Sequence, residues 1–272
     1  LDLVGFHGQT ILHKPQEGYS IQMGDANLLS KILKKKVVAQ FRQNDLKNGG
    51  QGAPLAPIYH FLIVNNIRVQ FPLAIINIGG ITNITYFNEK NFFLAFDIGP
   101  GNCLIDKWIY KHTKNLYDYN GKFAQKGNVR KDLLDIWLNN KVFHKNQPKS
   151  FDIKDFDVSK KLSGLNLEDG AATLSMMTVN LICESISNFS DYPTQVLICG
   201  GGRKNNFIFN NLKLNINCPV NKIDDFNFNG DFIESQTFAY LAIRSLLKKY
   251  LTYPSTTGVK APCLGGKLFN KS

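Results

Sequence analysis

One carboxylate lies where a chain could perform chemistry on a phosphate group. Asp97 follows a strand-like apolar run at residues 92–96 and precedes Gly99, Gly101 and a helix-like run at 103–110. Glycines let a phosphate approach the backbone, and a helix N-terminus offers N–H donors and the positive end of its dipole. A carboxylate at such a point can act as a general base. Because Asp is also a preferred helix N-cap, a purely structural turn is the alternative.

Two further glycine-rich segments follow apolar runs. Residues 74–86 comprise two β-branched runs joined at Gly79 and Gly80, a pattern typical of a hairpin. Residues 195–199 have the pattern of a buried strand, and three glycines and a predicted helix follow. The hairpin is expected to expose N–H groups to phosphates, and the glycine triplet to admit a flat nucleotide. The alternatives are a plain hairpin turn and a plain strand-to-helix connection.

The order of these motifs resembles the superfamily of sugar kinases, heat-shock chaperones and actin. The finer motifs resemble one family in it, the anhydro-N-acetylmuramic acid kinases. The matching segments run nearly from end to end and are His7-Gly8-Gln9-Thr10, residues 22–27, Phe41-Arg42 with Asp45, residues 49–55, Asn77-Ile78-Gly79-Gly80, Phe96 to Asn102, Cys199-Gly200-Gly201-Gly202, Gly230-Asp231 with Glu234, and Leu264-Gly265-Gly266.

The resemblance implies an α/β protein with the two-domain, actin-like or ribonuclease H-like ATPase fold. It implies an ATP-dependent kinase that phosphorylates 1,6-anhydro-N-acetylmuramic acid while water opens the anhydro ring, giving N-acetylmuramic acid 6-phosphate in peptidoglycan recycling. ATP and Mg²⁺ are the implied cofactors, with Mg²⁺ bridging the ATP phosphates and no dedicated protein metal site. Asp97 is implied as the base that activates the water.

Two sets of residues are implied as ligands of the nucleotide. The phosphate set, which would act through backbone N–H groups, comprises Asn77, Gly79 and Gly80. The adenosine set comprises Gly200, Gly201, Gly202 and Asn205.

The residues implied on the sugar side are His7, Gln9, Arg42, Asp45 and Glu234. Arg42 offers a fork that matches the lactyl carboxylate of the sugar, and Asp45 would orient Arg42 or a sugar hydroxyl. A structural ion pair at a domain edge is the alternative for Arg42. Glu234 also has an alternative, because Asp231 and Glu234 have capping-box spacing at a predicted helix start.

Composition narrows the class of protein. The chain has 272 residues, which is enough for two domains. Its net charge is +11, but the lysines are spread along the chain, so no nucleic-acid partner is expected. No apolar run is long enough to span a bilayer, and five cysteines without a Cys-x-x-Cys pair indicate reduced thiols of a cytoplasmic protein. The expected partners are therefore ATP and an amino sugar, with a homodimer left open.

The predicted elements divide the chain at residue 70. Residues 1–70, with strands at 1–10, 19–22 and 37–41, are predicted to be the remainder of a first α/β domain on the sugar side. Residues 71–272 are predicted to form the second, nucleotide-side domain, with its last helices packing back toward the first. The polar stretch at 140–156 is predicted to be an exposed loop.

One departure from the family concerns the start of the chain. Family members carry a phosphate loop of the type Gly-Thr-Ser-x-Asp-Gly in their first strands, whereas this sequence begins at Leu1 without one. The first domain is therefore expected to be incomplete, and the 272-residue chain to be aggregation-prone and nearly inactive. An inactive truncated remnant and an actin- or chaperone-like nucleotide-binding protein are the alternative functions.

Overall fold

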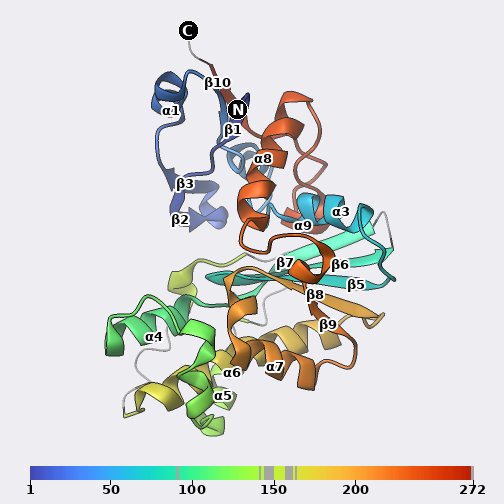
Figure 1. Cartoon of the computed structure of the whole chain (residues 1–272). Coiled ribbons are helices and arrows are strands. Elements are labelled where there is room, and N and C mark those ends of the chain that lie inside the picture. The colour runs from blue at the N-terminus through green and yellow to red at the C-terminus, as the bar shows by residue number, and fades with distance from the viewer. Residues whose placement is uncertain (90–91, 141, 144–149, 157–161, 163, 271–272) are drawn as a thin grey trace.

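The structure, a computed structural model, is built on a five-stranded sheet in the middle of the chain (Figure 1). It describes residues 1–89, 92–140, 142–143, 150–156, 162 and 164–270. The strand order is β7-β6-β5-β8-β9. The strands are β5 (Leu73–Ile78), β6 (Ile81–Glu89), β7 (Phe92–Pro100), β8 (Gln195–Cys199) and β9 (Val220–Lys222). The first three pair antiparallel, whereas β8 and β9 continue the sheet in parallel from β5.

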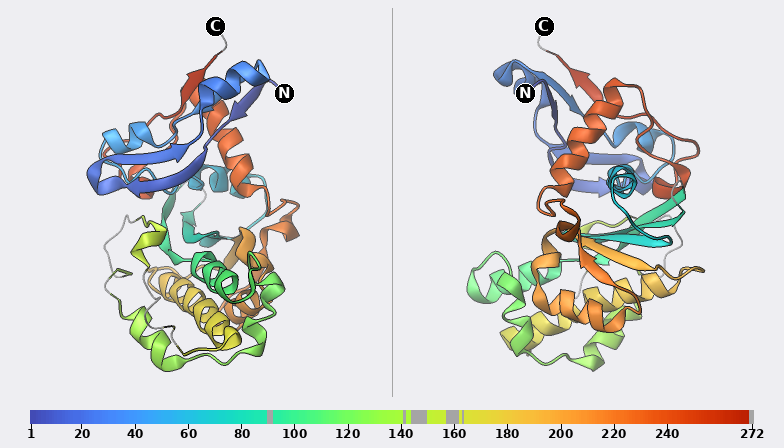
Figure 2. Two further views of the ribbon diagram at one scale, coloured as in Figure 1. Left: turned by 90° about the vertical axis from the view of Figure 1, so that its left-hand side faces the viewer. Right: turned by 45° about the vertical axis from the view of Figure 1, so that its right-hand side comes forward.

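Successive side chains of a strand point to opposite faces, so an apolar strand such as β5 makes both faces of the sheet apolar. Helices therefore cover each face. In β5, Ile76 packs into one apolar core and its neighbour Ile75 into another. The helices on the Ile76 face are α4 (Cys103–Thr113), α5 (Lys131–Leu138), α6 (Leu167–Ser187) and α7 (Asn206–Asn215) (Figure 2). Those on the opposite side are α3 (Pro57–Asn65), α8 (Ile233–Leu246) and α9 (Pro254–Thr257).

A second group of elements comes from the two ends of the chain. Its three-stranded sheet has the order β1-β4-β10, with β1 (Leu3–Gly5), β4 (Lys36–Ala39) and β10 (Lys267–Phe269). Around it lie the hairpin of β2 (Gln9–Lys14) and β3 (Tyr19–Met23) and the helices α1 (Ala26–Leu33) and α2 (Gln43–Lys47). The 3₁₀ turns are η1 (Pro15–Glu17), η2 (Tyr119–Gly121), η3 (Ala124–Lys126), η4 (Ile153–Asp155), η6 (Gly201–Lys204) and η7 (Ile223–Phe226).

Helix α8 joins the two groups of elements. It contacts β1, and a side chain on Gly5 of that strand would collide with the carbonyl group of Phe238. Phe238 and Leu241 of the same helix pack into the core on the α3 side of the large sheet. The start of α8 therefore lies between the N-terminal strands and the large sheet, where both can supply side chains to one site.

The mixed α/β class predicted from the sequence is confirmed, and the domain boundary at residue 70 stays a prediction. One local prediction was wrong, and another was wrong in part. The strand expected at 1–10 is broken at Gly8, which has a φ of 74°, a value that glycine tolerates best. The loop expected to be exposed at 140–156 is exposed only in part, because Phe151 and Phe156 are buried against Phe143. Residues 141 and 144–149 of this loop lie outside the described residues. Within the described part of the chain, no helix is long and apolar enough to cross a membrane.

Candidate active site

A cavity of about 530 Å³ lies between the N-terminal elements and the large sheet. It is lined by eight of the residues singled out from the sequence: His7, Gln9, Arg42, Asn77, Gly79, Gly80, Asp97 and Glu234. The lining that the described residues provide does not include Asp45, Gly200, Gly201, Gly202 or Asn205. The structure thus brings the predicted base, phosphate turn and sugar-side residues into one space.

Asp97 lies within β7, and its side chain faces the cavity. It is 6% exposed, and its Oδ2 accepts a hydrogen bond from the backbone N–H of Phe151 at 3.0 Å. The alternative in which Asp97 caps the following helix is wrong, because the N-cap of α4 is Asn102. A buried carboxylate held by a backbone N–H keeps a defined orientation, as a general base requires.

Arg42 is held in place by two neighbours. Its Nε donates to His7 Nε2 at 3.0 Å, and its Nη1 donates to the carbonyl oxygen of Gly52 at 2.6 Å. The ring of His7 stacks on Phe238 with a centroid distance of 4.3 Å. These two bonds use the Nε proton and one Nη1 proton of Arg42, and they leave one Nη1 proton and both Nη2 protons for a ligand.

Burial and neighbouring charges shift the pKa values of the groups around the cavity. Burial lowers the pKa of the Arg42 guanidinium, and the negative charges of Asp97 and Glu234 counteract this effect. Burial and the neighbouring Arg42 charge lower the pKa of His7 to about 4. His7 is therefore neutral at neutral pH, with Nδ1–H donating to Gly8 O at 2.8 Å and Nε2 free to accept from Arg42.

Asp45 does not face the sugar side as expected. Its side chain is 1% exposed and accepts from Gly52 N–H and from the Thr257 hydroxyl, both at 2.6 Å. A side chain at Gly50 would collide with the Asp45 carboxylate. Asp45 thus shapes the glycine-rich loop, and this loop supplies the Gly52 carbonyl that holds Arg42.

The hairpin turn at Gly79 and Gly80 docks on the segment that follows Asp97. The N–H of Asn102 donates to Gly79 O at 2.8 Å, and the N–H of Gly101 donates to Gly80 O at 2.9 Å. A Cβ at Gly101 would collide with Gly79 O, so only glycine fits there. These bonds use the carbonyl groups of the turn, and both of its glycines line the cavity.

The glycine triplet lies beside this turn. Gly200 has a φ of 78°, and added side chains at Gly200 and Gly202 would collide with Asn77 and Ile78. Asn205 caps α7, because its Oδ1 accepts from the N–H groups at positions 207 and 208 at 3.0 and 3.2 Å. This local role of Asn205 is the strand-to-helix alternative noted from the sequence, whereas exposed Gly201 stays open to a ligand.

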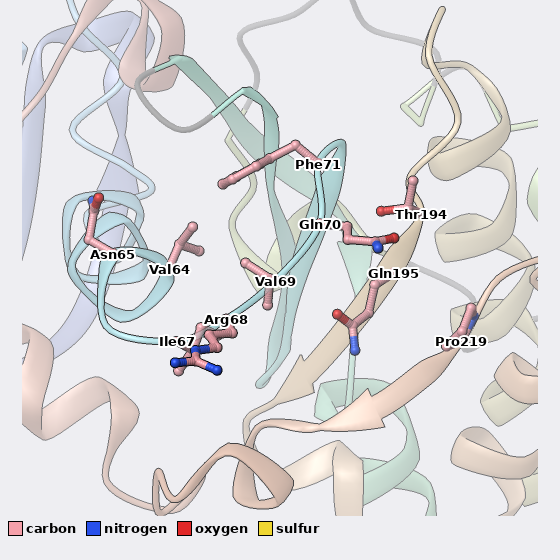
Figure 3. Close-up of a pocket in the computed structure, with 10 residues that line it drawn as sticks. All are labelled: Val64, Asn65, Ile67, Arg68, Val69, Gln70, Phe71, Thr194, Gln195 and Pro219. Carbon is pink, nitrogen blue, oxygen red and sulfur yellow. The ribbon is translucent and has the colours of Figure 1, made fainter.

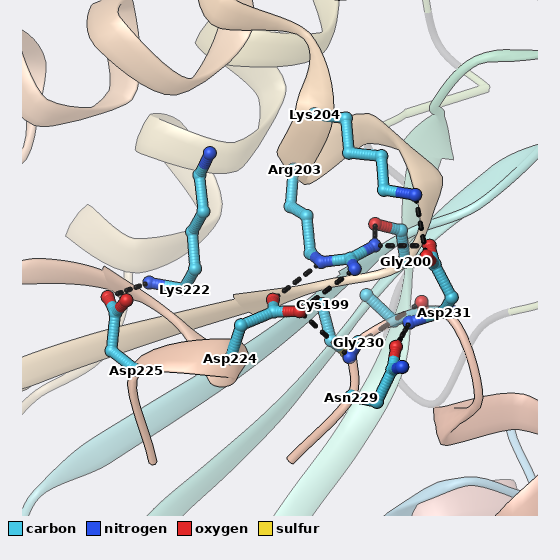
Figure 4. Close-up of polar contacts among 11 residues, drawn as sticks. Cys199, Gly200, Arg203, Lys204, Lys222, Asp224, Asp225, Asn229, Gly230 and Asp231 are labelled. Atoms are coloured by element: carbon cyan, nitrogen blue, oxygen red, sulfur yellow. Dashed lines mark hydrogen bonds and ion pairs between the residues drawn. The ribbon is translucent and has the colours of Figure 1, made fainter. Parts of the chain in front are cut away.

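An ion-pair network missed by the sequence analysis anchors the same loop (Figure 4). Arg203 is 3% exposed and donates to both oxygens of Asp224, at 2.7 and 3.0 Å. It also donates to Asp231 Oδ1 at 2.9 Å and to Gly200 O at 3.0 Å. Hydrogen bonds from Arg203 hold the pKa of both carboxyl groups below the ordinary range. An arginine directly after the glycines was the available signal.

The predicted capping box at Asp231 and Glu234 is wrong. The N-cap of α8 is Phe232 and makes no side-chain capping bond. Asp231 pairs with Arg203 and Lys204 instead, since a charged partner satisfies the carboxylate better than a backbone N–H. Glu234 is left to line the cavity.

His13 also lines the cavity, although the sequence analysis assigned it no role. Its Nδ1 lies 3.0 Å from Ser20 Oγ and its Nε2 lies 3.3 Å from Ser150 Oγ. Its backbone N–H donates to Asp152 Oδ2 at 3.3 Å. Residues 151–154 lie along the same cavity and so connect β2 to the Asp97 side. A polar stretch without apolar periodicity gave no signal for this placement.

A second cavity, of about 660 Å³, lies at the opposite end of β8 (Figure 3). It is lined by Val64, Asn65, Ile67, Arg68, Val69, Gln70, Phe71, Thr194, Gln195 and Pro219. This lining contains no carboxylate, histidine or cysteine that could act as an acid, base or nucleophile. The chemistry is therefore assigned to the smaller cavity.

A buried carboxylate, an arginine and a glycine turn around one cavity suit the transfer of a phosphoryl group, and the comparisons with known proteins show that the protein is a phosphotransferase. A family model described as Anhydro-N-acetylmuramic acid kinase matches residues 1–271. A relative of this name from Pelagibacter ubique (strain HTCC1062) is 49% identical over 98% of this chain and 74% of its own length. Another, from Zymomonas mobilis subsp. mobilis, is 41% identical over 98% and 73%. The chain belongs to the anhydro-N-acetylmuramic acid kinase family.

Similar solved structures are more remote. Component A of (R)-2-hydroxyglutaryl-CoA dehydratase from Acidaminococcus fermentans has a TM-score of 0.47 and 13% identity, over 84% of this chain and 88% of that one. A xylulose kinase from Lactobacillus acidophilus has a TM-score of 0.43 and 13% identity, over 79% and 46%. Likenesses at this level carry no information on the activity of this chain.

Proposed function

We propose that this protein transfers the γ-phosphoryl group of ATP to 1,6-anhydro-N-acetylmuramic acid and opens the anhydro ring, giving N-acetylmuramic acid 6-phosphate. The relatives named above support the substrate, and the cavity that contains Asp97 supports the chemistry. The product is one that a cell recycling its peptidoglycan in the cytoplasm would use.

In the proposed reaction Asp97 is the general base. A water oxygen attacks the anomeric carbon, and the bond from that carbon to O6 breaks. O6 bonds to the γ-phosphorus as the bond between phosphorus and ADP breaks, and one water proton passes to Asp97. The N–H of Phe151 donates to Asp97 Oδ2 and so helps to orient the carboxylate that takes this proton.

The remaining N–H groups of Arg42 are proposed to bind the lactyl carboxylate of the sugar. Its Nε and one Nη1 proton are already used by His7 and Gly52, so the guanidinium is oriented before the ligand arrives. An oriented donor loses less entropy on binding than a free side chain. Gln9 and Glu234 line the same cavity and would bind the sugar hydroxyl groups.

On the nucleotide side, Asn77, Gly79 and Gly80 are proposed to bind phosphates, and Gly200, Gly201 and Gly202 to face adenosine. The described residues contain no group of three or more His, Cys, Asp or Glu side chains that could hold a metal ion by themselves. Mg²⁺ bound with ATP is held largely by the phosphates and keeps several water ligands, so it needs no dedicated protein site. When bound, the ion would neutralise phosphate charge.

The observation that carries the proposal is that Asp97, Arg42 and the Gly79–Gly80 turn line one cavity, although they come from separate parts of the chain. The test is coupled detection of ADP and phosphorylated sugar with the wild-type chain and with Asp97→Asn. The variant should lose about 10²-fold or more of its turnover while nucleotide binding survives, since only the base is removed. Near-normal turnover by Asp97→Asn would refute the assignment, and phosphorylation of a different sugar in place of this one by the wild-type chain would refute the function.

A further inference from the structure

Three polar side chains form a row across the sheet at the cavity. Strand pairing places Asn77 of β5 opposite Asn83 of β6, and Asn83 opposite Asp97 of β7. Residues directly opposite each other on paired strands have side chains on the same face. All three line the cavity, so Asn83 lies between the proposed phosphate residue and the proposed base.

Asn83 has an unsatisfied acceptor. Its Oδ1 is buried and, within the described residues, has no hydrogen-bond partner. Buried polar atoms are rarely left without a partner, and in a cavity such an atom indicates a donor that comes from outside the chain. A core role for Asn83 would instead give its amide a protein partner.

The chemistry of the reactants restricts that donor. An amide oxygen only accepts hydrogen bonds, and so do the oxygens of an ionised phosphate. ATP phosphates therefore cannot satisfy Asn83 Oδ1. A water molecule can, because it has two protons and the proposed base takes only one of them.

We propose that Asn83 Oδ1 accepts a hydrogen bond from the second proton of the attacking water, an inference that rests on the proposed function. With one O–H directed at Asp97 and the other at Asn83, the lone pairs of the water oxygen point away from the sheet into the cavity. The bonds formed and broken are those given above, and the proton held by Asn83 stays on the attacking oxygen. Asn83 thereby restricts the orientation of the attacking water molecule.

The test compares Asn83→Leu with the matched variant Asn77→Leu, the same change on the neighbouring strand. Asn83→Leu should lower kcat about 10²-fold, the scale of a misplaced reactant, with KM for ATP and for the sugar unchanged. Asn77→Leu should instead raise KM for ATP, because it places an apolar side chain beside the phosphate that the backbone N–H groups of this segment are proposed to bind. A rise in KM for ATP in Asn83→Leu would show a phosphate ligand, and an unchanged kcat would show no role; either result overturns the inference.

Thermal unfolding gives a readout that does not depend on activity. Replacing an unpaired buried acceptor with an apolar group of similar shape should leave the Tm unchanged or raise it. A marked fall in Tm for Asn83→Leu would show that the amide holds the fold together, which overturns the inference. Failure of the proposed function is distinguishable, because the wild-type chain itself would then phosphorylate a different sugar in place of this one.

Discussion

Replacing Arg42 with lysine tests how the cavity recognises its sugar. Arg42 is oriented by His7 Nε2 at 3.0 Å and by Gly52 O at 2.6 Å, and lysine cannot reproduce this fork. A hydrogen bond to a charged group contributes about 1.5–3 kcal/mol, and each ~1.4 kcal/mol is tenfold in affinity. Arg42→Lys should therefore raise KM for 1,6-anhydro-N-acetylmuramic acid about 10- to 100-fold.

The assay is steady-state kinetics with this sugar and with an anhydro-sugar that lacks the lactyl group. The rise in KM should be confined to the lactyl sugar, because the other offers no carboxylate. Arg130→Lys is the matched control, since exposed Arg130 also makes two bonds, to Asp132, but lies outside the cavity lining. Equal losses on both sugars, with a lower Tm, would refute the reasoning and assign Arg42 a structural role.

Two predictions concern stability. Gly230→Ala would push a methyl group against buried Arg203, so overpacking should cost about 1–3 kcal/mol and lower the Tm by several degrees. Gly201→Ala is the control, because a methyl group there meets no atom closer than 3.7 Å. Equal Tm values for the two variants would contradict this prediction. Burial lowers the pKa of His60 to about 3, so below pH 6.5 the unfolded chain binds more protons than the folded chain. The free energy of unfolding should therefore rise between pH 5 and pH 6.5. Thermal melts across this pH range should show a smaller rise for His60→Gln.

The sequence by itself was sufficient for the elements that depend on local pattern. The β-branched runs around Gly79 and Gly80 form the predicted hairpin of β5 and β6, and the apolar run before Gly200 forms β8. Glycines mark places where no side chain fits, as at Gly101 against Gly79 O. These features can be predicted from the sequence because strand alternation and glycine geometry depend on residues that are close in the chain.

Only the tertiary structure decided which partner each polar side chain takes. Asp45 turned away from the cavity because Thr257, 212 positions along the chain, offers it a buried hydroxyl. Asp231 does not cap α8, because the positively charged side chain of Arg203, 28 positions away, binds its carboxylate instead. Asn83 entered the site through strand register, which places it opposite Asp97. A hydrogen bond depends on distances of about 3 Å between segments far apart in sequence, and only packing brings those segments together.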